Sequence, residues 1–434
     1  MTGAREAALE VLTACRKTDA WVDAALKSTL RRSKLDPRDA ALASRITYGV
    51  VQNRMLLDYY LDKLCKSGTG DLEPVILDIL RIGACQILLM DRIPHSAAVN
   101  EAVSMAKAHR RPRAAGMVNA VLRNLSRSKD TLQPPADLPR RTSHPKWLVD
   151  RYVELLGREE AERCLAANND PAPMTVQVNT LKATPAALTA ELQTAGIAVT
   201  PHPFLEGCLL LEGVGDIEAL PAFAEGRFLV QDAAARLAVL AMDCHPGMRL
   251  IDVCAAPGGK SFAAAMDMED RGKITACDIH PHKIRLIERG AERLGITCLR
   301  ARLADGRQRR EDFLESADRV LCDVPCSGLG IIRKKPDIRY KAPEALSGLP
   351  EVQLAILRNA GDYVKPGGLL LYSTCTILPE ENEKVVEAFL AGAPDFSREI
   401  FTLPGVGACP GEITLWPHRH QTDGFYICKL RKQL

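Results

Sequence analysis

The stretch Met248-Arg-Leu-Ile-Asp-Val-Cys-Ala-Ala-Pro-Gly-Gly-Lys260 decides how the C-terminal half of this 434-residue chain folds. An apolar segment ends at Asp252, a glycine-containing turn follows, and a helical pattern begins after it. Small residues let a ligand approach the backbone, and the first turn of a helix offers N–H groups without intrahelical partners. The order predicts a ligand-binding loop composed of Cys254, Ala255, Ala256, Pro257, Gly258, Gly259 and Lys260.

Acidic residues stand at the ends of the next two predicted strands. Asp278 follows Gly259 by nineteen residues, and Asp305 ends the third strand. An acidic residue at the second strand end accepts hydrogen bonds from ribose hydroxyls, and Asp305 is placed to meet an adenine edge. Because no GxGxxG is present, we expect a nucleotide-like ligand without a pyrophosphate, which disfavours an NAD-dependent dehydrogenase. A purely structural glycine turn is disfavoured too, because three strand-end features agree in order and spacing.

Apolar runs alternate with helical patterns through this region, which predicts an α/β, Rossmann-like sheet of parallel strands with helices on both faces. The C-terminal segment around His418–Gly424 instead predicts an antiparallel hairpin. The predicted parallel strands are MRLIDVCAA, KITACDI, ITCLRARL, DRVLCDVP and GGLLLYSTCT.

Two cysteines follow the fourth and fifth predicted strands. Cys326 lies in Asp323-Val-Pro-Cys-Ser-Gly328, and Cys375 lies in Tyr372-Ser-Thr-Cys-Thr376. Since the carboxyl ends of parallel strands share one edge of a sheet, both thiols are expected at the rim of the ligand site. A nearby cation such as Lys260 lowers a thiol pKa and makes the thiolate available as a nucleophile. Most cysteines are inert, but two at adjacent loops of one cleft favour a catalytic role.

The rest of the chain divides into two further regions. Helical periodicity over residues 1–130 predicts five to seven helices in an all-α bundle, and a polar, proline-rich linker covers residues 128–145. Helices and short strands then alternate in a small α+β module. The predicted domains are therefore residues 1–140, 141–232 and 233–434.

The formal charge of +3 is unevenly distributed. Residues 1–140 carry 22 Lys and Arg against 15 Asp and Glu, whereas the remainder carries 35 against 39. The basic N-terminal region is compatible with a polyanionic partner. The 14 cysteines are scattered without CxxC or a zinc-binding spacing, so we expect no metal and a reduced, cytoplasmic protein. Neither a membrane span nor a secretory signal is expected.

The motifs DVCAAPGGK, DVPCSGLG and STCTILPEENE resemble those of S-adenosylmethionine-dependent RNA cytosine-5 methyltransferases. IPHSAAVNEAVSMAK and GMVNAVLRN resemble a NusB-type RNA-binding helical domain. In this order, the helical domain, the middle module and the catalytic domain are similar to the bacterial 16S rRNA members of the 5-methylcytosine methyltransferase family. The resemblance extends over nearly the whole chain.

The resemblance implies S-adenosylmethionine as cofactor, 16S rRNA as partner and transfer of a methyl group to C5 of a specific cytosine. Cys375 matches the family's nucleophile, and Cys326 matches the cysteine associated with product release. Asp323 would hold the cytosine edge and, with the 254–260 loop, Asp278 and Asp305, matches cofactor-contacting positions. Ser261 stands where relatives often have Thr, and either residue offers a hydroxyl. We expect a monomer.

Basic clusters are candidates for RNA phosphate contacts. They comprise Arg110, Arg111 and Arg113 in the helical region, and Arg333, Lys334, Lys335 and Arg339 after the Cys326 motif. Two alternatives remain open at this stage. The first is a different substrate, because the same chemistry would serve tRNA or another rRNA site. The second is a non-catalytic RNA-binding assembly factor, against which the two cleft cysteines argue, because such a factor has no need of them. The role of residues 141–232 is expected to be RNA positioning.

Overall fold

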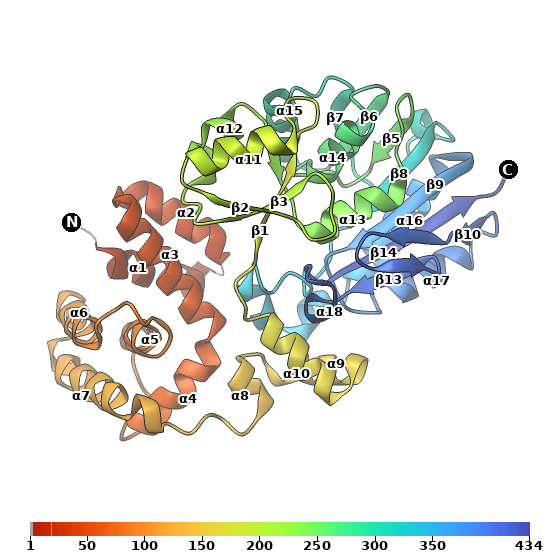
Figure 1. Ribbon diagram of the computed structural model, residues 1–434. Coiled ribbons are helices and arrows are strands. Elements are labelled where there is room, and N and C mark those ends of the chain that lie inside the picture. Colours follow the sequence, from red (N-terminus) through yellow and green to blue (C-terminus); the bar gives the residue numbers. More distant parts are fainter. Residues whose placement is uncertain (1–2, 19) are drawn as a thin grey trace. The chain divides into compact units, whose positions relative to one another are not determined.

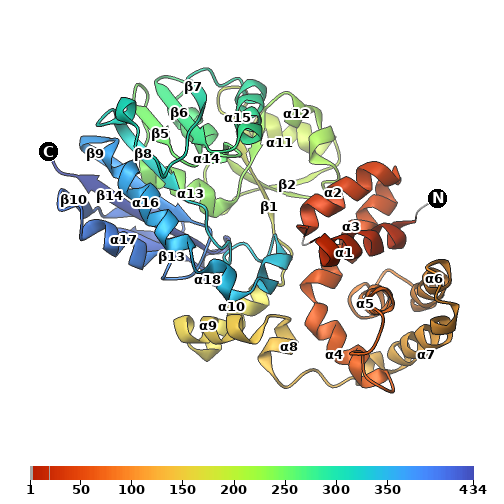
Figure 2. The same ribbon diagram turned by 180° about the vertical axis from the view of Figure 1, so that it is seen from behind.

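The computed structural model describes residues 3–18 and 20–434, which form two compact units (Figures 1 and 2). The first, the helical unit, contains Met1–Asp170 and Lys334–Lys341. The second, the sheet unit, contains Pro171–Arg333 and Ala342–Leu434. The three-domain division remains a prediction. Within the described residues, no helix has both the length and the apolarity needed to span a bilayer.

The helical unit confirms the predicted all-α bundle. Residues 4–128 form seven helices, as many as the upper limit predicted. The helices of this unit are α1 (Ala4–Thr18), α2 (Val22–Ser33), α3 (Pro37–Gln52), α4 (Arg54–Leu64), α5 (Pro74–Leu89), α6 (His95–Ala108), α7 (Pro112–Ser128), α8 (Leu138–Thr142), α9 (Lys146–Leu156) and α10 (Arg158–Ala167), with the 3-10 helices η1 (Lys129–Thr131) and η4 (Pro336–Tyr340).

Helix α5 is the centre of this unit. It packs against α1, α3, α4, α6 and α7, and Figures 1 and 2 show it with the other helices around it. Its sequence, PVILDILRIGACQILL, is apolar on most sides, as a surrounded helix requires. Gly83 allows the close approach of α7, because a Cβ there would lie 2.5 Å from the Leu122 side chain. The core of the bundle therefore lies along α5.

The sheet unit begins with a small antiparallel sheet in the order β2-β3-β1-β4. Its helices α11 and α12 cover an apolar core that includes Val176, Leu188 and Phe228. This βαββαβ arrangement confirms the predicted small α+β module. Its elements are β1 (Met174–Val178), α11 (Pro185–Thr194), β2 (Ala198–Pro201), β3 (Cys208–Glu212), η2 (Ile217–Ala219), α12 (Pro221–Ala224) and β4 (Phe228–Val230).

A larger mixed sheet follows, with the strand order β10-β14-β9-β8-β5-β6-β7 and β13 paired to β14. Strands β5 to β9 are the five predicted parallel strands. The strands are β5 (Arg249–Asp252), β6 (Lys273–Asp278), β7 (Leu299–Leu303), β8 (Ala317–Asp323), β9 (Val364–Thr374), β10 (Phe396–Arg398), β13 (Glu412–Leu415) and β14 (Phe425–Lys432), and β11 (Phe401–Leu403) pairs separately with β12 (Gly407–Cys409).

Helices cover both faces of the larger sheet, as predicted. Apolar residues of α13 (Ala233–Met242), α14 (Gly259–Asp267) and α15 (Pro281–Leu294) pack into one core. Those of α16 (Leu349–Asp362) and α17 (Glu383–Leu390) pack into another, and Figure 2 shows α16 in front of the sheet. The predicted C-terminal hairpin is confirmed by β13 and β14, with the short α18 (Pro417–His420) between them. The remaining 3-10 helices are η3 (Glu311–Phe313) and η5 (Pro343–Leu346).

Candidate active site

The 254–260 loop connects β5 to α14, as the sequence predicts. Ala255 donates its N–H to the carbonyl of Cys277 across 2.7 Å, which ties the loop to the neighbouring strand β6. Gly258 has φ of +112° and a Cβ there would lie 2.3 Å from the Phe262 ring, so only glycine fits this position. The turn therefore brings bare backbone to the carboxyl edge of the sheet.

Asp252, at the end of β5, holds this loop through hydrogen bonds. It was not among the predicted site residues. Its carboxylate accepts a hydrogen bond from the Ser261 hydroxyl at 2.6 Å and one from the Cys254 N–H at 3.3 Å. Burial raises the pKa of Asp252 to about 7, although the Ser261 bond opposes the shift. Ser261, at the position where Thr was expected, thus supplies the hydroxyl that orients a buried acid. The Asp that opens the DVCAAPGGK motif was the available signal.

Asp278 and Asp305 lie at the ends of β6 and β7, next to the loop. Asp278 is buried, accepts the N–H of His280 at 2.9 Å and lies 3.5 Å from the Lys283 ammonium. Asp305 pairs with the Arg307 guanidinium at 2.7 Å, and hydrogen bonds from Arg307 lower its pKa. Since β5, β6 and β7 are adjacent and parallel, the structure brings the loop and both carboxylates to one edge.

Asp323 and Lys260 form an ion pair in the middle of this edge. The Lys260 ammonium lies 2.7 Å from one oxygen of Asp323, and the Ser373 hydroxyl donates to the other oxygen at 2.7 Å. Burial alone would lower the pKa of Lys260, but the Asp323 carboxylate outweighs it and the pKa is raised. A charged lysine is therefore held beside the thiols, where the sequence placed a candidate cation.

The two predicted thiols come together. The sulfur atoms of Cys326 and Cys375 lie 3.2 Å apart, within hydrogen-bonding distance for sulfur. A hydrogen bond from Cys326 lowers the pKa of Cys375, and Lys260 acts in the same direction while burial and Asp323 oppose it. The same bond, together with burial, raises the pKa of Cys326 well above the ordinary thiol value. These two directions favour Cys326 as the hydrogen-bond donor and Cys375 as the acceptor.

The loops that carry the cysteines are joined by backbone contacts. The Gly330 N–H donates to the carbonyl of Cys375 at 2.9 Å, and the Gly424 N–H donates to the carbonyl of Gly330 at 2.8 Å. A Cβ on Gly330 would lie 1.9 Å from the Gly424 oxygen, so this position requires glycine. The hydroxyls of Ser327 and Thr376 are 2.7 Å apart. These contacts fix the separation of the sulfur atoms.

Glu381 holds the Cys326 loop through hydrogen bonds to its carboxylate. No role was predicted for this residue. One of its carboxylate oxygens accepts the Ser327 N–H at 2.9 Å and the Gln353 amide at 2.8 Å. Gln353 also donates to the carbonyl of Pro325 at 2.9 Å. Glu381 belongs to the STCTILPEENE motif, but its partners are 28 and 54 residues away, so only the fold shows its role.

Two of the predicted RNA contacts are buried, which corrects the prediction for them. Arg339 has no exposed surface and donates to the carbonyls of Gln52 and Ser143 and to the side chain of Asn169, at 2.9 to 3.1 Å. The Arg333 side chain is 8% exposed and lies 3.6 Å from Asp423. Arg339 therefore serves internal contacts, and Arg333 lies beside the Asp423 carboxylate with little side-chain surface left for RNA.

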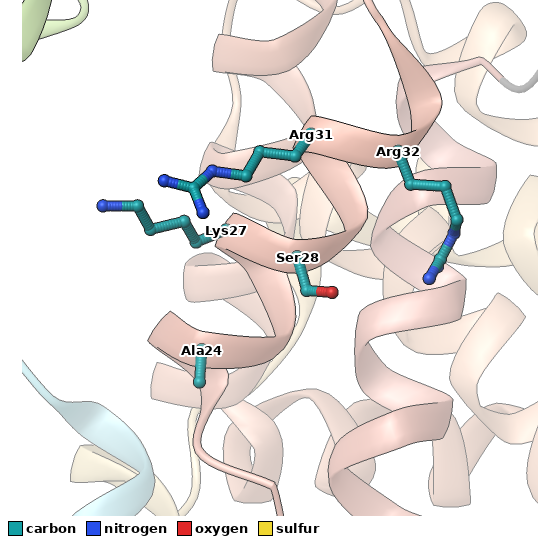
Figure 3. Close-up of a pocket in the computed structure, with 5 residues that line it drawn as sticks. All are labelled: Ala24, Lys27, Ser28, Arg31 and Arg32. Carbon is teal, nitrogen blue, oxygen red and sulfur yellow. The ribbon is translucent and has the colours of Figure 1, made fainter. Parts of the chain in front are cut away.

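The other predicted basic residues lie nearer the surface. Arg110, Arg113 and Lys335 are exposed, while Lys334 is half-buried, and Arg111 pairs with Glu73 at 2.6 Å. The sequence reasoning missed a further group on α2. Figure 3 shows Lys27 and Arg31 extending side by side, whereas Arg32 turns away and pairs with Glu10; the hollow at this helix is lined by Ala24, Lys27, Ser28, Arg31 and Arg32. The i, i+4 spacing of Lys27 and Arg31 was the available signal.

Histidine, cysteine and acidic side chains in the described part of the chain form no group of three or more suited to a metal ion. All 14 cysteines are free thiols. The site therefore consists of a backbone loop, three strand-end carboxylates, a buried lysine and a thiol pair.

Comparisons with known proteins match the chain along most of its length. Residues 2–127 match the NusB family, residues 144–218 match the ferredoxin-like domain of RsmF/B-like methyltransferases, and residues 239–431 match the family described as 16S rRNA methyltransferase RsmB/F. The solved structure titled PH0851 superposes with a TM-score of 0.81 at 27% identity, covering 99% of this chain and 98% of that one.

Curated relatives are similar over all or most of the chain. The probable ribosomal RNA small subunit methyltransferase B of Bacillus subtilis is 36% identical, covering 100% of this chain and 99% of the relative. The ribosomal RNA small subunit methyltransferase B of Vibrio cholerae is 37% identical, covering 93% and 92%. With the matching domain order and the loop geometry described above, these similarities show that the chain belongs to the S-adenosylmethionine-dependent RsmB/F family of 16S rRNA methyltransferases.

Proposed function

We propose that this chain methylates C5 of a cytosine in 16S rRNA through a covalent bond between Cys375 and C6 of the base. The observation that carries the proposal is the 3.2 Å separation of the Cys326 and Cys375 sulfur atoms beside the Lys260–Asp323 pair. A binding site for a methyl donor does not by itself indicate which atom accepts the methyl group. Paired thiols favour a carbon acceptor that must be activated by addition before it reacts.

The first step belongs to Cys375. Cytosine C5 is a poor nucleophile, but a thiolate that adds to C6 forms an S–C6 bond and moves the C5–C6 double-bond electrons into the ring. The resulting enamine is electron-rich at C5. The hydrogen bond from Cys326 favours the thiolate form of Cys375 before the attack. The target base leaves its stack so that the thiolate reaches its face.

Asp323 and Lys260 hold and polarise the base in this proposal. With Lys260 and Ser373 donating to it, the Asp323 carboxylate is fixed in position and offers its remaining lone pairs to the exocyclic amino group of cytosine. The Lys260 ammonium offsets the negative charge that develops on the ring during thiolate addition. Both groups are fixed before the base arrives, so little reorganisation is needed.

The residues at the strand ends suit S-adenosylmethionine, which supplies an electrophilic methyl group when bound. The backbone of the 254–260 loop, Asp278 and Asp305 would hold it, with Asp278 on the ribose hydroxyls and Asp305 on the adenine edge. The fit is supported by the glycine cradle at Gly258 and by the buried amide of Gln231 beside Gly259, whose hydrogen bonds are unmade within the described residues.

Product release is assigned to Cys326. After methylation the C5 proton must leave, and its bonding pair re-forms the C5–C6 double bond as the Cys375 thiolate departs. Cys326, whose raised pKa keeps it protonated, is held beside the reacting sulfur by Gly330 and Glu381, so it is placed to donate a hydrogen bond to the departing Cys375 thiolate while the C5 proton passes to solvent water. RNA phosphates would be bound by exposed cations, for which Lys27, Arg31, Arg110, Arg113 and Lys335 are proposed.

Tritiated methyl transfer to rRNA from a strain lacking the enzyme tests the proposal. We expect the wild-type chain to label 16S rRNA at one cytosine, for which position 967 of the RNA is proposed. Cys375→Ala should abolish transfer while binding of S-adenosylmethionine persists. Full transfer by Cys375→Ala would contradict the nucleophile assignment, and labelling of tRNA in place of 16S rRNA would favour the alternative substrate.

A further inference from the structure

Gln231 is a buried polar residue outside the loop motif, and the proposed function gives it no partner on the cofactor. The residue is 7% exposed, and neither its buried amide oxygen nor its buried amide nitrogen has a hydrogen-bond partner among the described residues. A primary amide has two donor hydrogens and an acceptor oxygen. Such groups are rarely left unpaired in protein interiors, because the lost hydrogen bonds to water are not replaced.

The backbone around Gln231 is fixed, so its position is well determined by the fold. Its N–H donates to the carbonyl of Thr175 at 3.2 Å, which continues the pairing of β4 with β1. The next residue, Asp232, caps α13 by accepting the N–H of Ala234 at 2.8 Å. The amide nitrogen of Gln231 lies 3.7 Å from the place a Cβ on Gly259 would occupy. The side chain therefore lies against the first residue of α14.

The order of groups along the sheet edge indicates which part of the cofactor meets Gln231. If Asp278 and Asp305 bind the ribose and adenine, the adenosine extends over β6 and β7, away from the cysteines. The reactive sulfur must then face Asp323, at the end of β8, and Cys375, directly after β9. The α-amino-acid group that remains is directed to the turn after β5, where Gln231 lies beside Gly259.

The chemistry of the two partners is complementary. An α-amino-acid group carries an ammonium, which donates, and a carboxylate, which accepts, and an amide can serve both. Lys260, in the same turn, already holds Asp323 at 2.7 Å, which leaves the carboxylate to N–H donors. We propose that the Gln231 amide binds the α-amino-acid group of S-adenosylmethionine, an inference that rests on the cofactor arrangement in the proposed function.

Calorimetry with two ligands tests this inference. S-adenosylmethionine carries the α-amino-acid group, whereas 5′-methylthioadenosine has the same adenosine and sulfur without it. Gln231→Met keeps the length of the side chain and removes its hydrogen bonds. We expect this variant to bind S-adenosylmethionine about tenfold or more weakly, with its affinity for 5′-methylthioadenosine unchanged. Gln177→Met, a buried glutamine on the adjacent strand β1, is the matched control and should change neither affinity.

Thermal unfolding without ligand separates a binding role from a structural one. Removing an unpaired buried amide should leave the melting temperature of Gln231→Met equal to or above the wild-type value, and Gln231→Ala provides a second variant with the same expected ligand selectivity. An equal loss of affinity for both ligands, or no loss for either, would overturn the inference and leave the proposed function standing. Failure of the wild-type chain to bind S-adenosylmethionine would overturn both.

Discussion

The sulfur atoms of Cys326 and Cys375 lie 3.2 Å apart, and a hydrogen bond between them shifts the pKa values of the two thiols in opposite directions, with Cys326 favoured as the donor. The donation lowers the pKa of Cys375 and raises that of Cys326. One cysteine is thereby prepared as a nucleophile by the other, before any RNA is bound. The pair is held by the Gly330 contact to Cys375, so the relationship is a property of the folded loops.

The pH dependence of alkylation tests this relationship. Iodoacetamide reacts with thiolates, so in the wild-type chain Cys375 should be modified at a lower pH than an ordinary thiol. Cys326→Ala removes the donor that lowers the pKa of Cys375, and its alkylation midpoint should move to higher pH. Mass spectrometry locates the modified cysteine. Cys298→Ala is the control, and an identical profile in Cys326→Ala would contradict the donor role.

Cys326→Ala should also trap the covalent intermediate. Addition by Cys375 and methylation still proceed, but the thiol that donates a hydrogen bond to the departing Cys375 thiolate is absent, so elimination is slow. We expect a protein band shifted by bound RNA on a denaturing gel. The double variant with Cys375→Ala should show no shifted band. Normal turnover by Cys326→Ala without a shifted band would remove Cys326 from the release step.

Gly330→Ala should separate the cysteine loops. A Cβ at this position would lie 1.9 Å from the Gly424 backbone oxygen, which cannot move without displacing the start of β14. Misplacement of reacting groups by about 1 Å costs roughly 100-fold in rate, so kcat should fall by about that factor while affinity for S-adenosylmethionine is retained. Gly348→Ala, whose Cβ has nothing within 4 Å, should behave as wild type. A wild-type kcat in Gly330→Ala would contradict the coupling of the loops.

The strand ends were the predictable part of the site. The runs that became β5 to β9 are apolar and short, and parallel strands bring their carboxyl ends to one edge, so the order of the motifs predicted their neighbours. Asp278, Asp323 and the two cysteines follow from this rule. The spacing of apolar residues likewise predicted the helices of the bundle. Helices with one apolar face surround α5, and α5 itself is apolar on most sides because it is surrounded.

Long-range polar contacts were not predictable in the same way. Arg339 follows Arg333, Lys334 and Lys335, and a local charge run is usually solvated. Its burial depends on carbonyls of Gln52 and Ser143, which are 287 and 196 residues away. A single sequence contains no signal for such a partner. The role of Glu381 was unpredictable for the same reason. An acidic residue in a polar motif gives no indication of the distant N–H groups from which its carboxylate accepts hydrogen bonds.

Asp252 predicts a pH dependence of stability. Its pKa is raised from 3.8 to about 7 by burial, so between these values the folded chain binds a proton that the unfolded chain has lost. This contribution is complete below about pH 4 and is lost as the pH rises through 7. Asp252→Asn should therefore lessen the fall in melting temperature between pH 5 and 8. Equal falls in wild type and variant would contradict the raised pKa.

Lys335 and Arg339 should respond in opposite ways, although they are four residues apart. Lys335 is exposed, so Lys335→Ala should weaken RNA binding and reduce the slope of log affinity against log salt by about 1, with stability unchanged. Arg339→Ala leaves one buried and two partly buried acceptors without this donor and should lower the free energy of unfolding by about 3 kcal/mol. Filter binding at several salt concentrations and urea unfolding measure the two effects. A reduced salt slope in Arg339→Lys with unchanged stability would return Arg339 to the RNA-binding surface.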